Sequence, residues 1–133
     1  MTFAFPLVGL VTLLMIGVFF WMGINEAKSR QKHDSPPPAM TGPDELLRYM
    51  RVRGNTEEGL LMFFPALWLF AICWGDTIAA VLGLIYVVGR ILYATGYYAD
   101  AKKRSIGFMI GFLATIVLWV GAIAGLGMQA LGM

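Results

Sequence analysis

Long apolar stretches separated by short polar segments dominate the chain. The runs without a charged residue cover positions 1–25, 59–75, 77–89 and 105–133. The third run continues past Arg90 to position 99 with no further charge. A helix that crosses the hydrocarbon core of a membrane needs about 20 mostly apolar residues. The pattern therefore predicts four membrane-spanning helices, near residues 4–25, 45–74, 77–101 and 105–131.

The predicted architecture is an all-α, four-transmembrane-helix up-down bundle that forms one domain over residues 1–133. Composition agrees, because 59% of the residues are hydrophobic and 14% are charged, against about 25% charged in soluble proteins. The first run could instead be a signal peptide. No cation precedes it, it is long, and no small-residue cleavage site follows it, so a first spanning helix is the better interpretation. The only cysteine, Cys73, lies in an apolar helix and is expected to pack rather than react.

Lysine and arginine are concentrated in two polar segments. The segment from Lys28 to Arg53 carries six of them, and positions 102–104 carry three. The opposite side has Asp76 and no lysine or arginine. The positive-inside rule then predicts that both basic loops are cytoplasmic and that both ends of the chain lie across the membrane. A bacterial inner membrane and the endoplasmic reticulum both remain open as locations.

A proline-rich segment connects the first two predicted helices. Its prolines at 36–38 favour a stiff, extended connector over a partner-binding motif. His33 in this segment is expected to be solvated. Thr41 and Pro43, followed by two acids, are typical of a helix start with Thr41 as the cap. A helix from Pro43 to Trp74 would be about 48 Å long, so its first turns must project beyond a hydrocarbon core of about 30 Å.

Polar residues in the second predicted helix recur on one face. Arg51, Asn55 and Glu58 are at positions i, i+4 and i+7, which places a cation, an amide and a carboxylate in one stripe. Ionisable groups at membrane depth are costly and usually mark a functional site. The stripe is therefore a candidate binding surface.

A second polar stripe follows the third predicted helix. Arg90, Tyr93 and Tyr97 are at i, i+3 and i+7, and Arg104 lies two heptads beyond Arg90. If the second and third helices turn near positions 75–76, residues at equal depth have numbers that sum to about 151. This register places Tyr93 level with Glu58, Tyr97 near Asn55, and Arg90 within a turn of Glu58.

Two interpretations of this match are open. Glu58 and Arg90 could form a purely structural ion pair. The remaining cations, which include Arg51, Arg53 and Arg104, favour a pocket for a small peptide with excess carboxylates. The fourth helix offers no side chains for chemistry, and its two pairs of glycines, 107/111 and 121/125, allow close packing within or between subunits.

Two segments of the sequence resemble the MAPEG family, membrane-associated proteins of eicosanoid and glutathione metabolism. They are TGPDELLRYMRVRGNTEEGLLMFFP at 41–65 and GRILYATGYYADAKKR at 89–104. Their combination is similar to microsomal glutathione transferases and leukotriene-C synthases, and the similarity covers nearly the whole chain. The resemblance implies a homotrimer of four-helix subunits, with glutathione as co-substrate between neighbours.

The resemblance also implies roles for individual residues. One subunit would bind glutathione through Arg51, Asn55, Glu58, Tyr93 and Tyr97, and the position of Arg90 on the second stripe adds it to this set. Arg30 and Arg53 would reach in from the next subunit. Arg104 matches the arginine that stabilises the glutathione thiolate and is the predicted catalytic residue. Gly59 replaces a tyrosine of the close relatives, which removes one expected hydroxyl contact, and Arg53 replaces an amide-bearing residue.

The implied activity is that of a membrane-bound glutathione transferase. The thiolate would attack a lipophilic electrophile that arrives from the lipid bilayer, or reduce a lipid hydroperoxide. Neither a metal nor a nucleic-acid partner is expected. A non-enzymatic relative that binds and presents lipid is one alternative, and a small four-helix membrane transporter is another. The presence of Arg104 together with Arg51, Asn55 and Glu58 disfavours the lipid-presenting relative. The absence of an acidic residue in residues 1–25 disfavours the transporter.

Overall fold

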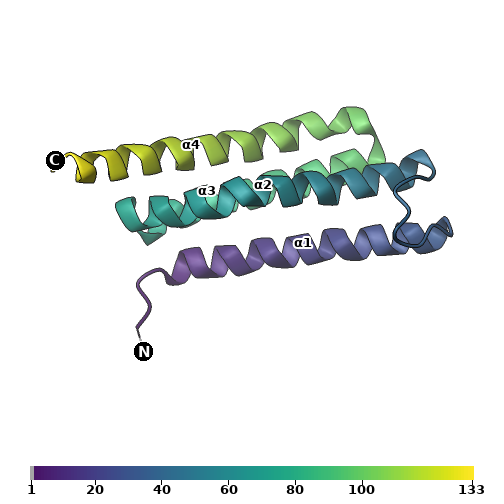
Figure 1. Ribbon diagram of the computed structural model, residues 1–133, viewed down its shortest axis with the longest axis horizontal. Helices are drawn as coiled ribbons and strands as arrows, with labels where there is room; N and C mark the ends of the chain where they lie inside the picture. The colour runs from purple at the N-terminus through teal and green to yellow at the C-terminus, as the bar shows by residue number, and fades with distance from the viewer. Residues whose placement is uncertain (1) are drawn as a thin grey trace.

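The computed structural model describes residues 2–133, which form four long helices. The elements are α1 (Pro6–Lys32), α2 (Asp44–Trp74), α3 (Asp76–Ala99), the short 3-10 helix η1 (Ala101–Arg104) and α4 (Ser105–Ala130). Each of the four long helices is long and apolar enough to cross a membrane. The helices run alternately up and down, so the start of α1 and the end of α4 lie at the same end of the bundle (Figure 1). The predicted all-α four-helix bundle is therefore confirmed.

The helices are arranged in three layers. Figure 1 shows α2 and α3 in the middle, with α1 on one side and α4 on the other. The core consists mainly of aliphatic and aromatic side chains, and in it the rings of Phe63 and Tyr86 stack at a centroid distance of 3.7 Å. The middle layer therefore has two separate sides, one that packs against α4 and one that packs against α1.

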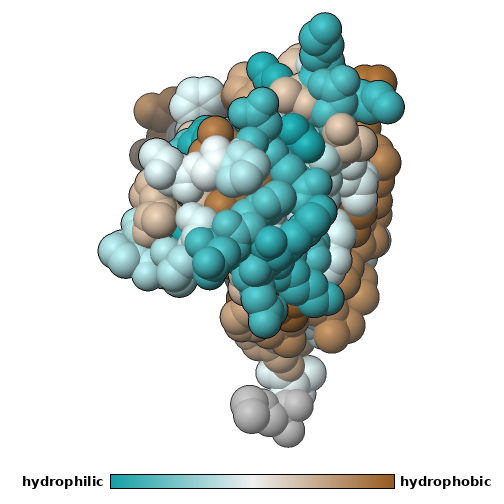
Figure 2. Space-filling model, turned by 90° about the vertical axis from the view of Figure 1, so that its right-hand side faces the viewer, coloured by the Kyte–Doolittle hydropathy of each residue, from teal (hydrophilic) through white to brown (hydrophobic). Residues whose placement is uncertain are grey.

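The helices extend beyond their apolar runs at one end of the bundle. α1 continues to Lys32, seven residues past its predicted end. Glu26 and Arg30 lie one turn apart on the same face, and their ion pair of 3.1 Å stabilises these added turns. Figure 2 looks at this end and shows hydrophilic residues gathered over it, with hydrophobic residues along the flanks. The surface pattern is that of a helical bundle whose polar end projects from a membrane.

The connector between α1 and α2 is tied to both helices. α2 begins at Asp44 with Pro43 as its N-cap and without a side-chain cap, so the predicted cap at Thr41 is wrong. The Nζ atom of Lys32 donates to Glu45 Oε1 at 2.9 Å, and His33 Nε2 lies 3.2 Å from the same oxygen. His33 is thus partly shielded rather than freely solvated. The hydrogen bonds from Lys32 and then His33 hold the pKa of the Glu45 carboxyl, outside the apolar run, below its usual range.

The turn between α2 and α3 also holds the start of α1. Gly75 separates the two helices with a φ of 105°, a conformation that favours glycine. The carboxylate of Asp76 accepts hydrogen bonds from the backbone N–H groups of Leu7 at 3.0 Å and Val8 at 2.8 Å. These N–H groups have no partner inside their own helix. Asp76 is therefore a cap for α1 supplied from a distant part of the chain.

Glycines allow α4 to lie directly against its neighbours. A Cβ atom at position 107 would overlap the backbone of Tyr93 in α3. Gly121 faces the ring of Phe70 in α2, and a Cβ at 125 would lie 2.6 Å from the Cβ of Cys73. Small residues permit such close approach between helices in a membrane. Both glycine pairs therefore include positions that pack within the subunit.

Candidate functional site

Five of the predicted site residues line one pocket at the polar end of the bundle. We call it the polar pocket, and its volume is about 500 Å³. The five residues are Arg51 and Asn55 from α2, Tyr93 and Tyr97 from α3, and Arg104 from η1. The helical spacing within each stripe and the hairpin register had predicted that Tyr97 lies near Asn55, and the structure places both in this pocket.

The first turns of α4 add three residues that sequence reasoning missed. Ser105, Phe108 and Met109 complete the lining of the polar pocket, although we had expected no chemistry from this helix. Only five residues separate the end of α3 from the start of α4, so the first turn of one lies at the same depth as the last turn of the other. The short turn between α3 and α4 was the sequence feature that could have predicted this contribution. It brings the hydroxyl of Ser105 into the site.

Arg104 lies at the edge of the polar pocket. Its guanidinium is 5.5 Å from the ring centroid of Tyr97 and donates a hydrogen bond to the backbone oxygen of Ala101. None of the ion pairs formed by residues 2–133 includes Arg104. Its charge is therefore available to an anion in the pocket.

Arg90 lies deeper, where it is buried with 4% of its surface exposed. Its Nη1 atom donates to Asn55 Oδ1 at 2.8 Å and lies 3.4 Å from Thr56 Oγ1. The guanidinium also lies 5.0 to 5.8 Å from the ring centroids of Tyr86, Tyr93 and Phe108. Arg90 thus fixes the Asn55 amide and does not form the ion pair with Glu58 that was one interpretation of the sequence.

Glu58 instead lies near Arg51, two turns earlier on the same face of α2. The two charged groups are 3.8 Å apart, and both side chains are more than half exposed. Exposed ion pairs of this kind contribute only about 0–1 kcal/mol to stability. Both groups can therefore exchange this contact for contacts with a ligand at little cost.

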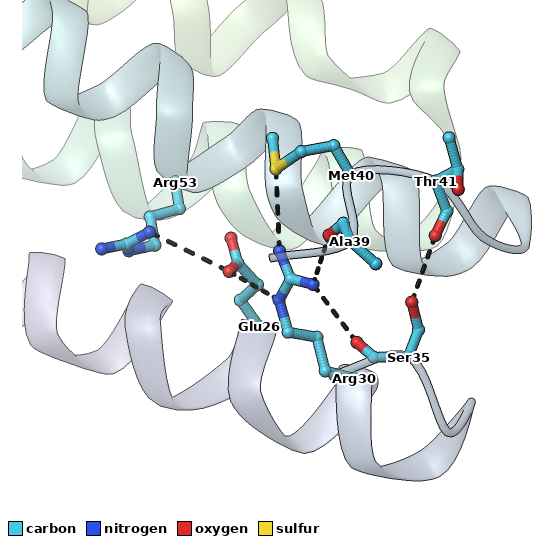
Figure 3. Close-up of polar contacts among 7 residues, drawn as sticks. All are labelled: Glu26, Arg30, Ser35, Ala39, Met40, Thr41 and Arg53. Atoms are coloured by element: carbon cyan, nitrogen blue, oxygen red, sulfur yellow. Dashed lines mark hydrogen bonds and ion pairs between the residues drawn. The ribbon is translucent and has the colours of Figure 1, made fainter. Parts of the chain in front are cut away.

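Arg30 and Arg53 lie on the α1–α2 side of the bundle, and neither lines the polar pocket (Figure 3). Arg30 is 8% exposed and donates to Glu26 and to the backbone oxygens of Ser35 and Ala39, the last at 2.7 Å. Arg53 approaches the same Glu26 oxygen at 3.9 Å and remains 43% exposed. Within the subunit, Arg30 holds the connector against the end of α1.

Two further spaces continue from the polar pocket along the α2–α4 side. A cavity of about 210 Å³, here called the junction cavity, shares Asn55 and Phe108 with the polar pocket. An apolar groove of about 570 Å³ shares Met62, Thr115 and Ile116 with the junction cavity. The three spaces together lead from the polar end of the bundle into its apolar middle.

A family model described as the MAPEG family matches residues 8–124, nearly the whole chain. The chain belongs to the MAPEG family. The predicted family is therefore confirmed, and its four apolar helices make this MAPEG protein a multi-pass membrane protein.

Individual relatives of this MAPEG chain include proteins with named activities. An uncharacterised protein of Synechocystis is 46% identical over 114 residues, 86% of this chain and 83% of the relative. Human microsomal glutathione S-transferase 2 is 37% identical over 100 residues, 74% of this chain and 68% of the relative. Leukotriene C4 synthase of Cavia porcellus is 32% identical over 98 residues, 74% of this chain and 65% of the relative.

Proposed function

We propose that the protein is a membrane-bound glutathione transferase. It would bind glutathione in the polar pocket and join its thiolate to a lipophilic electrophile. The observation that carries this proposal is the composition of the polar pocket, which gathers Arg51, Asn55, Tyr93, Tyr97 and Arg104 from three elements. Similarity to a relative named as a glutathione transferase supports the same activity.

The charges around the polar pocket suit glutathione, a peptide with two carboxylates and one amine. Arg51 offers a guanidinium group for a carboxylate, since charge-assisted hydrogen bonds to carboxylates are strong and directional, and Arg104 offers a second cation for the thiolate. Glu58 lies beside Arg51 and can accept from the amine. The Asn55 amide, held by Arg90, and the hydroxyl of Tyr97 can bond to the peptide groups.

Arg104 would hold the thiol of glutathione in its ionised form. A free thiol of this kind has a pKa of about 8.5, and a nearby cation lowers it. The thiol proton passes to water, and the thiolate sulfur attacks the electrophilic carbon of the acceptor. A C–S bond forms while the bond from that carbon to the leaving group breaks, and the leaving group takes the electron pair, so the product is a thioether. With a lipid hydroperoxide, two glutathione molecules instead supply the electrons, and the products are an alcohol, water and glutathione disulfide.

The apolar groove provides a route for the acceptor. It runs between α2 and α4 and is lined by residues such as Leu61, Pro65 and Trp119. An acceptor with a hydrocarbon chain gains about 0.8 kcal/mol for each CH₂ group that it buries. Because the groove meets the junction cavity, a chain bound there can present its reactive end towards the polar pocket.

The proposal includes a homotrimer with the polar pocket between neighbours and the basic loops on the cytoplasmic side, in a bacterial inner membrane or the endoplasmic reticulum. In such an assembly a neighbour's α1–α2 side would face the polar pocket. Arg53 is the better candidate for a contact with glutathione, because it is 43% exposed while Arg30 is committed to its own connector. Arg30 would then position Arg53 through the Glu26 carboxylate that both approach.

The binding step is tested by calorimetry with glutathione on the detergent-solubilised protein. Arg51→Ala should weaken binding by about ten- to a hundredfold, because a hydrogen bond to a charged group contributes about 1.5–3 kcal/mol. Arg51 is exposed, so its removal should leave the fold intact. Unchanged affinity in the folded variant would mean that the polar pocket is not the glutathione site.

The ionisation step is tested by titrating the ultraviolet absorbance of bound thiolate against pH. We expect the signal to move to higher pH in Arg104→Ala and to stay in place in Lys103→Ala, its neighbour in the same turn. Conjugation activity should fall with the thiolate signal. If the thiolate signal responds to pH in the same way in both variants, Arg104 does not ionise the thiol and is only one of the charges of a basic loop.

A further inference from the structure

Two buried polar atoms of residues that line the junction cavity have no hydrogen-bond partner within residues 2–133. They are the hydroxyl of Tyr86, a residue that is 1% exposed, and Nε of Arg90, which is 4% exposed. An unpaired buried polar group costs about 1–3 kcal/mol, and more when it is charged. Native proteins keep few such groups, and each calls for an explanation. Two such atoms beside one cavity could both be satisfied by a polar atom from outside the chain.

Arg90 also lacks an anion. None of the ion pairs formed within residues 2–133 includes it. Its neighbours are the neutral oxygens of Asn55 and Thr56 and three aromatic rings. A buried cation without a counter-ion is unfavourable, and an anion that develops beside it is strongly stabilised. Glu58 also lines the junction cavity, but its carboxylate pairs with Arg51 and its side chain is 65% exposed. The buried side of the cavity, beside Arg90, is therefore suited to negative charge that appears during a reaction.

Gly59 lets these two groups pack directly against the backbone of α2. A Cβ atom at this position would lie 2.8 Å from Nη2 of Arg90 and 3.0 Å from the hydroxyl of Tyr86. Glycine in the middle of a helix costs about 0.5–1 kcal/mol relative to alanine. Arg90 and Tyr86 thus occupy the space that a side chain at position 59 would fill.

The junction cavity is also where two substrates would meet. It shares Asn55 with the polar pocket, which would hold the thiolate, and Met62 with the apolar groove, which would hold the acceptor chain. The reacting atoms of both would lie between these two spaces.

We propose that Tyr86 and Arg90 are catalytic residues that bind the acceptor's oxygen, with Tyr86 as its proton donor. This role rests on the proposed transferase function and concerns acceptors whose bond to oxygen breaks. With a lipophilic epoxide, the thiolate forms a C–S bond and the C–O bond breaks. The electron pair passes to the oxygen, which is bonded by the Arg90 guanidinium and takes the Tyr86 proton. Water returns a proton to the tyrosinate after the product leaves, so the net products are a thioether and an alcohol.

The test compares two acceptors with the Tyr86→Phe variant. This change removes only the hydroxyl and keeps the ring stacked on Phe63. One acceptor is 1,2-epoxydodecane, whose oxygen needs a proton, and the other is benzyl chloride, whose chloride leaves without one. Since a general acid contributes about 10²–10⁴-fold, we expect kcat with the epoxide to fall by about a hundredfold. With benzyl chloride kcat should change little, and the KM for glutathione should be unchanged with both acceptors.

Two matched variants complete the design. Tyr98→Phe removes a hydroxyl that accepts from Asn25 outside the junction cavity, and it should leave both activities unchanged. Gly59→Ala should displace the Arg90 guanidinium and the Tyr86 hydroxyl and so reduce activity with the epoxide more than activity with benzyl chloride. This second variant keeps the proposal testable if Tyr86→Phe does not fold.

The outcomes separate the two proposals. Equal losses with both acceptors, or no loss with either, would show that Tyr86 is a structural residue, while transfer by the wild type would still support the transferase function. A wild-type protein that conjugates neither acceptor would refute the transferase function and this role with it.

Discussion

Replacement of Gly107 by alanine should push α4 away from α3 beside the polar pocket. The new Cβ atom would overlap the backbone of Tyr93 and lie 2.7 Å from the backbone oxygen of Gly89. Carbon atoms in favourable contact are about 3.5–4.0 Å from their neighbours, so the helices must separate by about 1 Å. Backbone atoms cannot rotate away as a side chain can. The strain must therefore be relieved by moving a helix.

The magnitude follows from the kind of contact. Overpacking a well-packed core costs about 1–3 kcal/mol, and a clash with backbone on the facing helix places Gly107→Ala at the upper end. Gly127→Ala is the matched control, because it lies in the same helix and has nothing within 4 Å of the new Cβ. There alanine should stabilise the helix by up to about 1 kcal/mol relative to glycine.

The assay is thermal unfolding in detergent, followed by the circular dichroism of the helices. A change of 1 kcal/mol shifts the midpoint of a domain of this size by about 4 °C. We expect the midpoint to fall by about 10 °C in Gly107→Ala and to stay level or rise slightly in Gly127→Ala. Glutathione affinity should fall in Gly107→Ala as well, since Tyr93 lines the polar pocket. Equal midpoints for the two variants would refute the argument that α4 packs on α3 through backbone contact at this glycine.

Three further predictions concern the ends of the bundle and its assembly. Asp76→Ala should lose about 1 kcal/mol of stability, as other lost helix caps do, and hydrogen exchange at Leu7 and Val8 should quicken; unchanged exchange would show that Asp76 is not the cap. Arg30→Ala removes the hydrogen bonds to the carbonyl oxygens of Ser35 and Ala39, so it should loosen the connector and speed exchange of its amide hydrogens, such as the Ala39 N–H that donates to Pro36. Weaker glutathione binding without faster exchange would make Arg30 a ligand. Mass spectrometry from detergent should find three chains of 14.6 kDa, about 44 kDa in all, and monomers or dimers alone would exclude a site shared by a trimer.

The helices could be predicted closely because membrane thickness sets their length. The predicted starts and ends of α2, α3 and α4 agree with the structure within two residues. The end of α1 was missed by seven residues. An apolar run reports where a helix leaves the hydrocarbon core, and it carries no information on charged turns that continue beyond it. Those turns depend on local pairs such as Glu26 and Arg30.

The depth of the site residues along the helices could be predicted from the sequence, but the directions in which their side chains point could not. Helical spacing and the position of the turn were sufficient to bring Asn55 and Tyr97 into one pocket. They did not determine the partner of Arg90, because successive side chains on a helix point about 100° apart. Asn55 faces Arg90, while Glu58 at a similar depth points to the exposed side. The contribution of Ser105 depended on how α4 packs against α3, which no spacing within one helix reveals.

The cap on α1 has a consequence for how the protein is made. Val8 and Asp76 are joined by a hydrogen bond although 68 positions separate them along the chain. At a synthesis rate of about 5–20 residues per second, Asp76 is made roughly 3–14 s after Val8. During that interval the leading N–H groups of α1 have to remain without the cap that Asp76 supplies. The first twenty residues of α1, from Pro6 to Asn25, carry no charge, so the helix can be stable in the bilayer before Asp76 is made. Final docking of the first helix then depends on arrival of the third.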